Sequence, residues 1–157
     1  MLHLVQLATS LVFVLLAAYD LRFRRLPNPF VVAVVVLYVV AAPLAHTSLV
    51  SFAQHLATAA LAFVLSALMF RLGWIGAGDA KLAAAVFLWA GPSFAVSALL
   101  LTGVGGFVLA LAVLAHRHTL LVRPSRAGEV PYGIALALAG TAAVWASFAA
   151  PAPAPVL

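Results

Sequence analysis

Residues 73–92 read GWIGAGDAKLAAAVFLWAGP, and this stretch decides the fold because it places a short apolar helix between two sets of helix breakers. Three glycines precede the helix, and Gly91-Pro92 should end it. A helix over 79–90 would be about 18 Å long at about 1.5 Å per residue. A bilayer has a hydrocarbon core of roughly 30 Å and normally needs about 20 helical residues.

A helix this short must be re-entrant, be continued by irregular chain, or lie below the membrane surface at one end. Each arrangement places Asp79 on non-helical backbone, which membranes tolerate only where protein buries it or water lines it. The glycines before Asp79 suit that setting because they permit close approach to the backbone. The alternative is that Asp79 is only an N-terminal cap, a position where Asp is preferred.

The whole composition indicates an integral membrane protein. The chain is 67% hydrophobic and 7% charged, whereas soluble domains carry about 25% charged residues. The absence of cysteine excludes disulfides and thiolate metal sites. No Lys or Arg precedes Arg22, so the first apolar stretch is expected to be a retained span and not a secretory signal.

Apolar stretches separated by breakers predict an all-α, polytopic fold with about six transmembrane helices. They form a single domain over residues 1–150, followed by an extended Pro/Ala-rich tail at 151–157. Two faces of small residues recur every four positions and are expected to pack closely against other helices: Thr102, Gly106 and Ala110, and Gly133, Ala137 and Thr141. The expected helices are 2–19, 30–45, 52–72, 79–90, 94–116 and 132–149.

All eight basic residues fall in, or directly flank, alternate connections between these helices. Lys and Arg mark cytoplasmic loops, so both termini should face outward. The net charge of +5 is therefore explained by basic residues that orient the chain in the membrane, and these residues could also attract anionic lipid. A nucleic-acid partner is not expected. The basic residues are Arg22, Arg24, Arg25, Arg71, Lys81, Arg117, Arg123 and Arg126.

Two of the three carboxylates suggest chemistry. Asp20 ends the first expected helix and Asp79 begins the fourth, both on the cytoplasmic side. If these helices are neighbours, the carboxyls converge and share one proton, so that one takes a proton from water while the other donates to a peptide carbonyl. Helix dipoles would then favour the proton on Asp20.

Other interpretations of these carboxylates remain open. Asp20 could be a solvated loop residue that pairs with Arg22 or Arg24. The same two aspartates would also suit a small transporter or channel subunit that relays protons or cations. A third alternative is a catalytically inactive assembly scaffold in the membrane.

Three ordered stretches resemble the type IV prepilin peptidases, which are membrane aspartic endopeptidases with a Gly-x-Gly-Asp motif. They are YDLRFRRLPN (19–28), GAGDAKLAAAVFLWAG (76–91) and VPYGIALALAG (130–140). The resemblance covers about residues 5–150. It implies a peptidase of a bacterial or archaeal cytoplasmic membrane that removes the short basic leader from prepilin-like substrates at the cytoplasmic face.

Many members of that family carry a cysteine-containing extension and also methylate the new N-terminus. This chain lacks cysteines and the extension, so it resembles the short, peptidase-only form of the Flp or tight-adherence pilus type. Methyltransferase activity is therefore in question. The expected substrate is an Flp-type prepilin, and no cofactor is expected.

The resemblance also implies a set of site residues. Asp20 and Asp79 would be catalytic, and Gly76, Gly78 and Lys81 would support them. Lys81 could instead be an interfacial lysine whose ammonium reaches water, and Tyr132 an interfacial aromatic. No metal is expected, because His116 and His118 are two residues apart and do not share a helix face. The residues that could line the substrate site are Pro27, Asn28, Tyr132 and Gly133.

Overall fold

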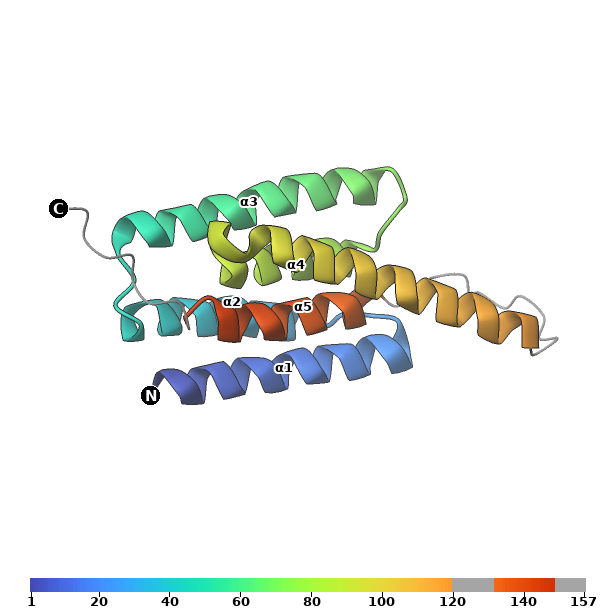
Figure 1. Cartoon of the computed structure of the whole chain (residues 1–157), viewed down its shortest axis with the longest axis horizontal. Coiled ribbons are helices and arrows are strands. Elements are labelled where there is room, and N and C mark those ends of the chain that lie inside the picture. Colours follow the sequence, from blue (N-terminus) through green and yellow to red (C-terminus); the bar gives the residue numbers. More distant parts are fainter. Residues whose placement is uncertain (120–131, 149–157) are drawn as a thin grey trace.

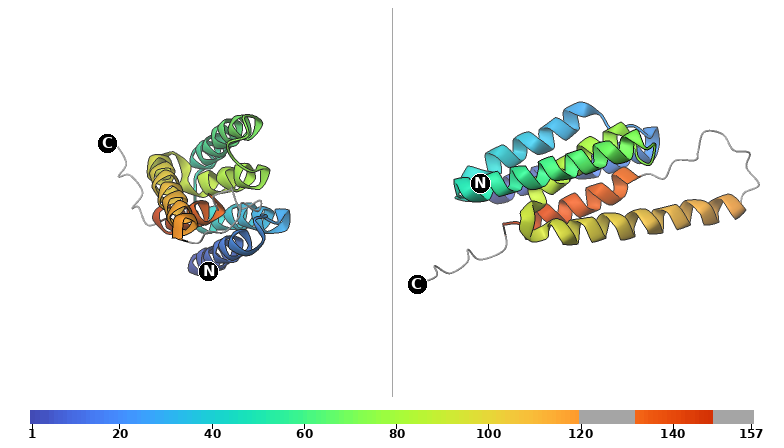
Figure 2. Two further views of the ribbon diagram at one scale, coloured as in Figure 1. Left: turned by 90° about the vertical axis from the view of Figure 1, so that its right-hand side faces the viewer. Right: turned by 90° about the horizontal axis from the view of Figure 1, so that it is seen from above.

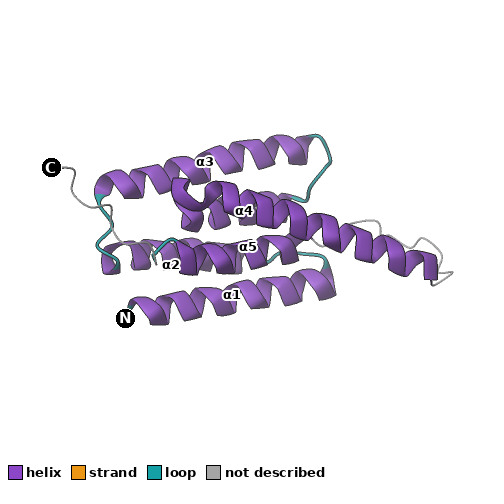
Figure 3. Cartoon of the chain, in the orientation of Figure 1, coloured by secondary structure: helices purple, strands orange, loops and turns teal. Residues whose placement is uncertain are grey.

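A computed structural model describes residues 1–119 and 132–148, and in these residues every regular element is a helix (Figures 1 and 3). The predicted all-α class is therefore confirmed for the described part of the chain. The tail at 151–157 lies outside it. The elements are α1 (Leu2–Phe23), α2 (Asn28–Leu44), α3 (Leu49–Arg71), α4 (Ala77–Thr119) and α5 (Tyr132–Ala146).

The described residues form five helical elements and not the six expected. The segments predicted as separate helices at 79–90 and 94–116 are joined without a loop in α4. The chain reverses at Gly91, whose φ of 57° and ψ of −175° are not helical. We call residues 77–90 the first arm of α4 and residues 92–119 the second arm. The second arm runs in the direction opposite to the first (Figure 1). Glycine adopts positive φ without steric cost, so one residue suffices for the reversal.

Several helix boundaries also differ from those predicted. α1 continues to Phe23, so Asp20 lies inside the helix and not at its end. α2 already begins at Asn28, because Pro29 occupies its first turn, where a proline costs no helical hydrogen bond. α3 begins at Leu49, where the Ser48 hydroxyl accepts a 3.1 Å hydrogen bond from the Ser51 N–H.

The helices pack in an order that the sequence did not predict. α5 packs against both α4 and α1, α2 also contacts α1 and α4, and α3 packs against α4. α1 and α4 do not pack extensively against each other, so the expected adjacency of the two helices that carry the aspartates is wrong. Seen end-on, α3 lies at the periphery of the bundle (Figure 2).

The reversal in α4 leaves backbone carbonyls without helical partners, and side chains from other helices donate to them. Pro92 has no N–H to offer the carbonyl of Leu88, four residues earlier. The Nδ1 atom of His55 in α3 lies 2.9 Å from that oxygen. The Ser147 hydroxyl, just after α5, donates to the Trp89 carbonyl. This distribution of donors follows the rule that buried backbone groups are paired.

A cluster of aromatic side chains fills the space beside this reversal. Trp89 is fully buried and its Nε1 donates a 3.0 Å hydrogen bond to the carbonyl of Val34 in α2. The fully buried ring of Tyr38 meets it edge-on, at 5.5 Å between ring centroids. The first arm of α4 is thereby fixed to α2 at the end far from Asp79.

Among the described residues, three helical stretches are long and apolar enough to cross a membrane: Leu2–Phe23, Leu49–Arg71 and Ala77–Ala112, the last of which includes the reversal at Gly91. α2 and α5 are apolar but shorter. Large apolar side chains are exposed on the outside of the bundle, as expected for surfaces that face lipid. Met1 and the end of α5 lie at one end of the bundle, and the α1–α2 and α3–α4 connections lie at the other (Figure 1). The orientation in the membrane remains a prediction.

Candidate active site

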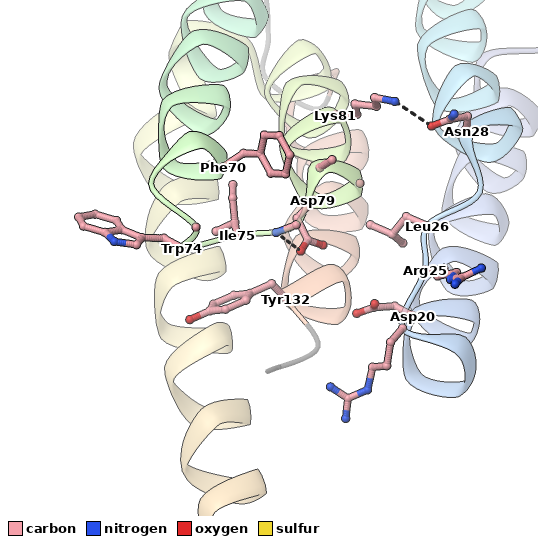
Figure 4. A pocket seen from close by; sticks show the side chains of 15 residues that line it. Asp20, Arg25, Leu26, Asn28, Phe70, Trp74, Ile75, Asp79, Lys81 and Tyr132 are labelled. Atoms are coloured by element: carbon pink, nitrogen blue, oxygen red, sulfur yellow. Dashed lines mark hydrogen bonds between the residues drawn. The ribbon is translucent and has the colours of Figure 1, made fainter. Parts of the chain in front are cut away.

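A cavity of about 820 Å³ opens where the α1–α2 and α3–α4 connections meet the start of α5. Figure 4 shows this cavity with Asp20 and Asp79 on different walls, supplied by α1 and α4. It is lined by Asp20, Arg24, Arg25, Leu26, Asn28, Phe70, Gly73, Trp74, Ile75, Gly76, Ala77, Gly78, Asp79, Lys81 and Tyr132.

Asp79 lies in the first turn of α4, half-buried at the cavity wall. Its Oδ2 accepts a 3.3 Å hydrogen bond from the backbone N–H of Gly76, the residue before the helix. The first N–H groups of a helix have no partner within the helix, and a carboxylate in the first turn can accept a hydrogen bond from the N–H of the N-cap residue. Asp79 therefore caps its helix and also faces the cavity, so the capping alternative and the functional one are compatible.

Asp20 reaches the same cavity from inside α1. Its side chain is only 6% exposed, so the interpretation as a solvated loop residue is wrong. The backbone N–H groups of Gly133 and Ile134 lie within interaction range of the carboxyl. The buried Oδ2, however, makes no hydrogen bond of good geometry within the described residues. The prediction that the proton resides on Asp20 relied on the dipoles of the two helices that carry the aspartates, and it stays a prediction. The position of Asp20 against the start of α5 was not predicted.

The two carboxyls reach one cavity although α1 and α4 do not pack extensively on each other; α5, which packs against both helices, begins at this cavity. They are the two described carboxylates of a chain that contains three, since Glu129 lies outside the described residues. Two carboxyl groups around one cavity can act as a general acid and a general base, if a substrate places a scissile bond between them.

The glycines of the Gly-x-Gly-Asp stretch are explained by contacts. A Cβ atom on Gly76 would stand 3.1 Å from the Oδ2 of Asp79, and one on Gly78 would stand 3.0 Å from the Cβ of Leu26. The first glycine leaves room for the aspartate, and the second lets the α1–α2 connection close the cavity wall. Both were expected to support the site, and both lie at the cavity.

The remaining expected residues divide into two groups. Lys81, Asn28 and Tyr132 line the cavity, and the Lys81 ammonium donates a 3.1 Å hydrogen bond to the Asn28 side-chain oxygen. Pro27 and Gly133 are not among the lining residues. Gly133 instead lies directly against the Asp20 side chain.

Sequence reasoning missed an apolar wall of the cavity. Phe70 at the end of α3 and Trp74 and Ile75 in the following loop line this side of the cavity, although the Trp74 ring points away from Asp79 (Figure 4). Trp74 is 67% exposed although it is large and apolar. The sequence could have indicated this role, because Trp74 lies inside the glycine-rich stretch before Asp79. Exposed aromatic residues beside a polar site often contact ligands.

No cluster that could hold a metal is found within residues 1–119 and 132–148. His116 and His118 have side chains outside the described set, so the prediction about them is not tested. The donors at the cavity are two carboxylates among cationic and neutral groups.

A comparison with protein families gave one match: the sequence model of the family described as the type IV leader peptidase family matches residues 7–111. This range is more than half of the 157-residue chain and contains both Asp20 and Asp79. Searches of curated proteins and of solved structures found no match.

Proposed function

The chain belongs to the type IV leader peptidase family, and from this premise we propose that it is an aspartic endopeptidase that uses Asp20 and Asp79. The observation that carries the proposal is the shared cavity: two carboxylates from distant parts of a carboxylate-poor chain line the same space. A cavity lined by these carboxylates and by apolar side chains suits hydrolysis of a peptide held at a membrane.

In the proposed reaction one aspartate is ionised and the other carries a proton. The ionised carboxylate takes a proton from a water molecule, whose oxygen attacks the peptide carbonyl carbon. The other carboxyl donates its proton to the carbonyl oxygen. Collapse of the tetrahedral intermediate breaks the C–N bond. The amine leaves with the proton that the first carboxyl took from water, and a hydroxyl of the intermediate returns its proton to the second carboxylate as the carbonyl group re-forms. The resulting carboxyl and carboxylate are ready for the next cycle.

We propose an Flp-type prepilin as the substrate, cut after its short basic leader at the cytoplasmic face of a prokaryotic cytoplasmic membrane. The substrate's own apolar helix would stay in the bilayer. The exposed apolar residues beside Asp79, above all Trp74, support a substrate whose mature segment is apolar next to the cut.

The test is co-expression of the chain with such a prepilin, followed by mass measurement of the pilin. The native chain should remove the leader, whereas Asp20→Asn and Asp79→Asn should each lower the rate by roughly 10²–10⁴-fold. Glu129→Gln, which changes the remaining carboxylate of the sequence, should retain cleavage. Cleavage by the double Asp20→Asn/Asp79→Asn variant would exclude the proposal. An intact prepilin together with ion flux through the native chain would favour the transporter alternative instead.

A further inference from the structure

The Asp20 side chain is pressed against the first turn of α5. A Cβ atom on Gly133 would stand 2.7 Å from the Asp20 Oδ2 and 2.8 Å from its Cγ. Only a glycine fits here, because real Cβ atoms do not approach other heavy atoms so closely. The first backbone N–H groups of a helix have no partner within it, and those of Gly133 and Ile134 are in range of this carboxyl. The position of Asp20 is therefore set by where α5 begins.

The beginning of α5 is in turn set by a second close contact. The ring of Tyr132 lies on Gly106 in the second arm of α4: a Cβ there would stand 2.8 Å from Tyr132 Cε1 and 3.0 Å from its Cδ1. One turn further along α5, a Cβ on Gly105 would meet the Cβ of Ala135 at 3.3 Å. Two adjacent glycines thus bring the helices close and form a notch that receives the Tyr132 ring.

These contacts form a continuous chain from the second arm of α4 to the candidate catalytic group. Gly106 receives Tyr132, Tyr132 precedes Gly133 in the same helical turn, and Gly133 abuts Asp20. The Asp20 side chain points from α1 toward the start of α5, and Tyr132 extends from that start along the cavity (Figure 4).

We propose that Gly106 is a positioning residue for Asp20. By leaving space for the Tyr132 ring, it fixes the first turn of α5 and hence the backbone against which the Asp20 carboxyl is held. Gly106 does not line the cavity, so it acts through Tyr132 and Gly133 and not on substrate. Its effect on cleavage rests on the proposed peptidase function, but its effect on the Asp20 environment does not.

The chain offers a matched control three residues away. A Cβ on Gly103 would meet nothing within 4 Å. Gly103→Ala and Gly106→Ala therefore make the same chemical change in the same helix, with the same expected gain of about 1 kcal/mol in helix propensity. Only the second change places a methyl group under the Tyr132 ring.

The first measurement is the infrared carboxyl signal of Asp20 in the full chain, reconstituted in lipid nanodiscs with isotope-labelled aspartate. The signal is assigned by its loss in Asp20→Asn. Gly106→Ala should shift this band and Gly103→Ala should not. In a Tyr132→Ala background, Gly106→Ala should cause no further shift, because the new methyl group then meets no ring.

The second measurement separates kcat from KM for leader removal. Gly106→Ala should lower kcat by roughly 10-fold or more, since misplacing a catalytic group by about 1 Å can cost about 100-fold. The Gly106→Ala/Tyr132→Ala variant should have the same kcat and KM as Tyr132→Ala alone, whose KM should be raised because Tyr132 lines the cavity. Gly103→Ala should match the native chain in both constants.

An unchanged Asp20 band in a folded Gly106→Ala variant would overturn the proposal, even if KM rose. If Gly106→Ala does not fold, Tyr132→Ala alone replaces it: removing the ring should also shift the band, whereas Tyr132→Phe, which keeps the ring, should not. Should no prepilin be cleaved by the native chain, the proposed function fails while the infrared test still decides the role of Gly106.

Discussion

The Nζ atom of Lys81 lies 3.1 Å from the Oδ1 atom of Asn28 and donates a hydrogen bond to it. Lys81 belongs to the first arm of α4 and Asn28 is the first residue of α2. Both side chains line the cavity, so this bond closes its rim between the wall that carries Asp79 and the connection that follows Asp20.

We expect the Lys81–Asn28 bond to be worth about 1 kcal/mol or less in stability, because both groups are exposed. Its effect should appear in cleavage, as the two residues hold one edge of the cavity. Lys81→Met and Asn28→Ala should each raise KM, and the double variant should be no worse than the more damaging single change. Asn28→Asp, which keeps an acceptor for Lys81, should remain close to native. Fully additive effects in this double-mutant cycle would show that the bond is unimportant.

Gly91→Ala should unfold the chain at lower temperature. The residue has φ of 57°, which costs a non-glycine residue about 1–2 kcal/mol. Its Cβ would also stand 2.3 Å from the His55 Nε2, so the combined loss of stability should exceed about 2 kcal/mol. Thermal unfolding in detergent measures it, with Gly103→Ala as the control that should be slightly stabilised. Replacing His55 by Ala in the Gly91→Ala background should not restore native stability, because the backbone strain remains.

Replacement of His55 alone tests the pairing at the reversal. His55→Phe keeps a ring in the aromatic cluster but leaves the Leu88 carbonyl without its donor, since Pro92 supplies none. The expected cost is about 1–3 kcal/mol for an unsatisfied buried acceptor. His46→Asn is the matched control: His46 is exposed in the turn after α2 with φ of 53°, which Asn tolerates. Equal unfolding temperatures for the two variants would contradict the proposed role of the His55–Leu88 contact.

Alanine substitutions of the two glycines in the Gly-x-Gly-Asp stretch should impair cleavage in different ways, one through kcat and the other through KM. In Gly76→Ala the new Cβ lies 3.1 Å from the Asp79 Oδ2, so we expect kcat to fall by roughly 10-fold or more because the carboxyl is displaced. In Gly78→Ala the Cβ presses on the Cβ of Leu26 at 3.0 Å, so the cavity wall moves and KM should rise.

A second substitution in Gly78→Ala separates these effects. Leu26→Gly removes the contacted Cβ and should partly restore KM, whereas Leu26→Ala keeps that atom and should not. If Gly76→Ala and Gly78→Ala showed the same fall in kcat and the same rise in KM, both substitutions would act through general destabilisation.

The sequence was sufficient to predict the helical segments and the break at Gly91, because both depend on local chemistry. Apolar runs form helices in any lipid environment, and a glycine followed by proline ends one. The same local signals correctly placed Asp79 after a glycine-rich turn, but they placed Asp20 at the end of the first helix, whereas it lies inside α1. Six helices were predicted and five elements are described, because the chain reverses at the single residue Gly91 and the two arms of α4 are joined without a loop.

Helix adjacency was not predictable in the same way. Hydrophobic periodicity shows which face of a soluble helix is buried, but these helices are apolar all round, so no face is distinguished. The contact of Gly133 with Asp20 and the notch at Gly106 depend on which helices meet. Small residues indicated that close packing would occur, but not with which partner. For that reason the sequence suggested α1 against α4, whereas α5 lies beside both.

The reversal at Gly91 makes the spacing of the two aspartates depend on contacts at the opposite end of the molecule. The first arm of α4 carries Asp79, and the second arm carries Gly106, from which the contacts through Tyr132 and Gly133 lead to Asp20. The angle between the arms is set about 20 Å away, given the 77–90 length at about 1.5 Å per residue. A small change of angle at this pivot would therefore produce a larger change in the separation of the two carboxyls, so residues at the end of the bundle far from the cavity can influence the candidate site.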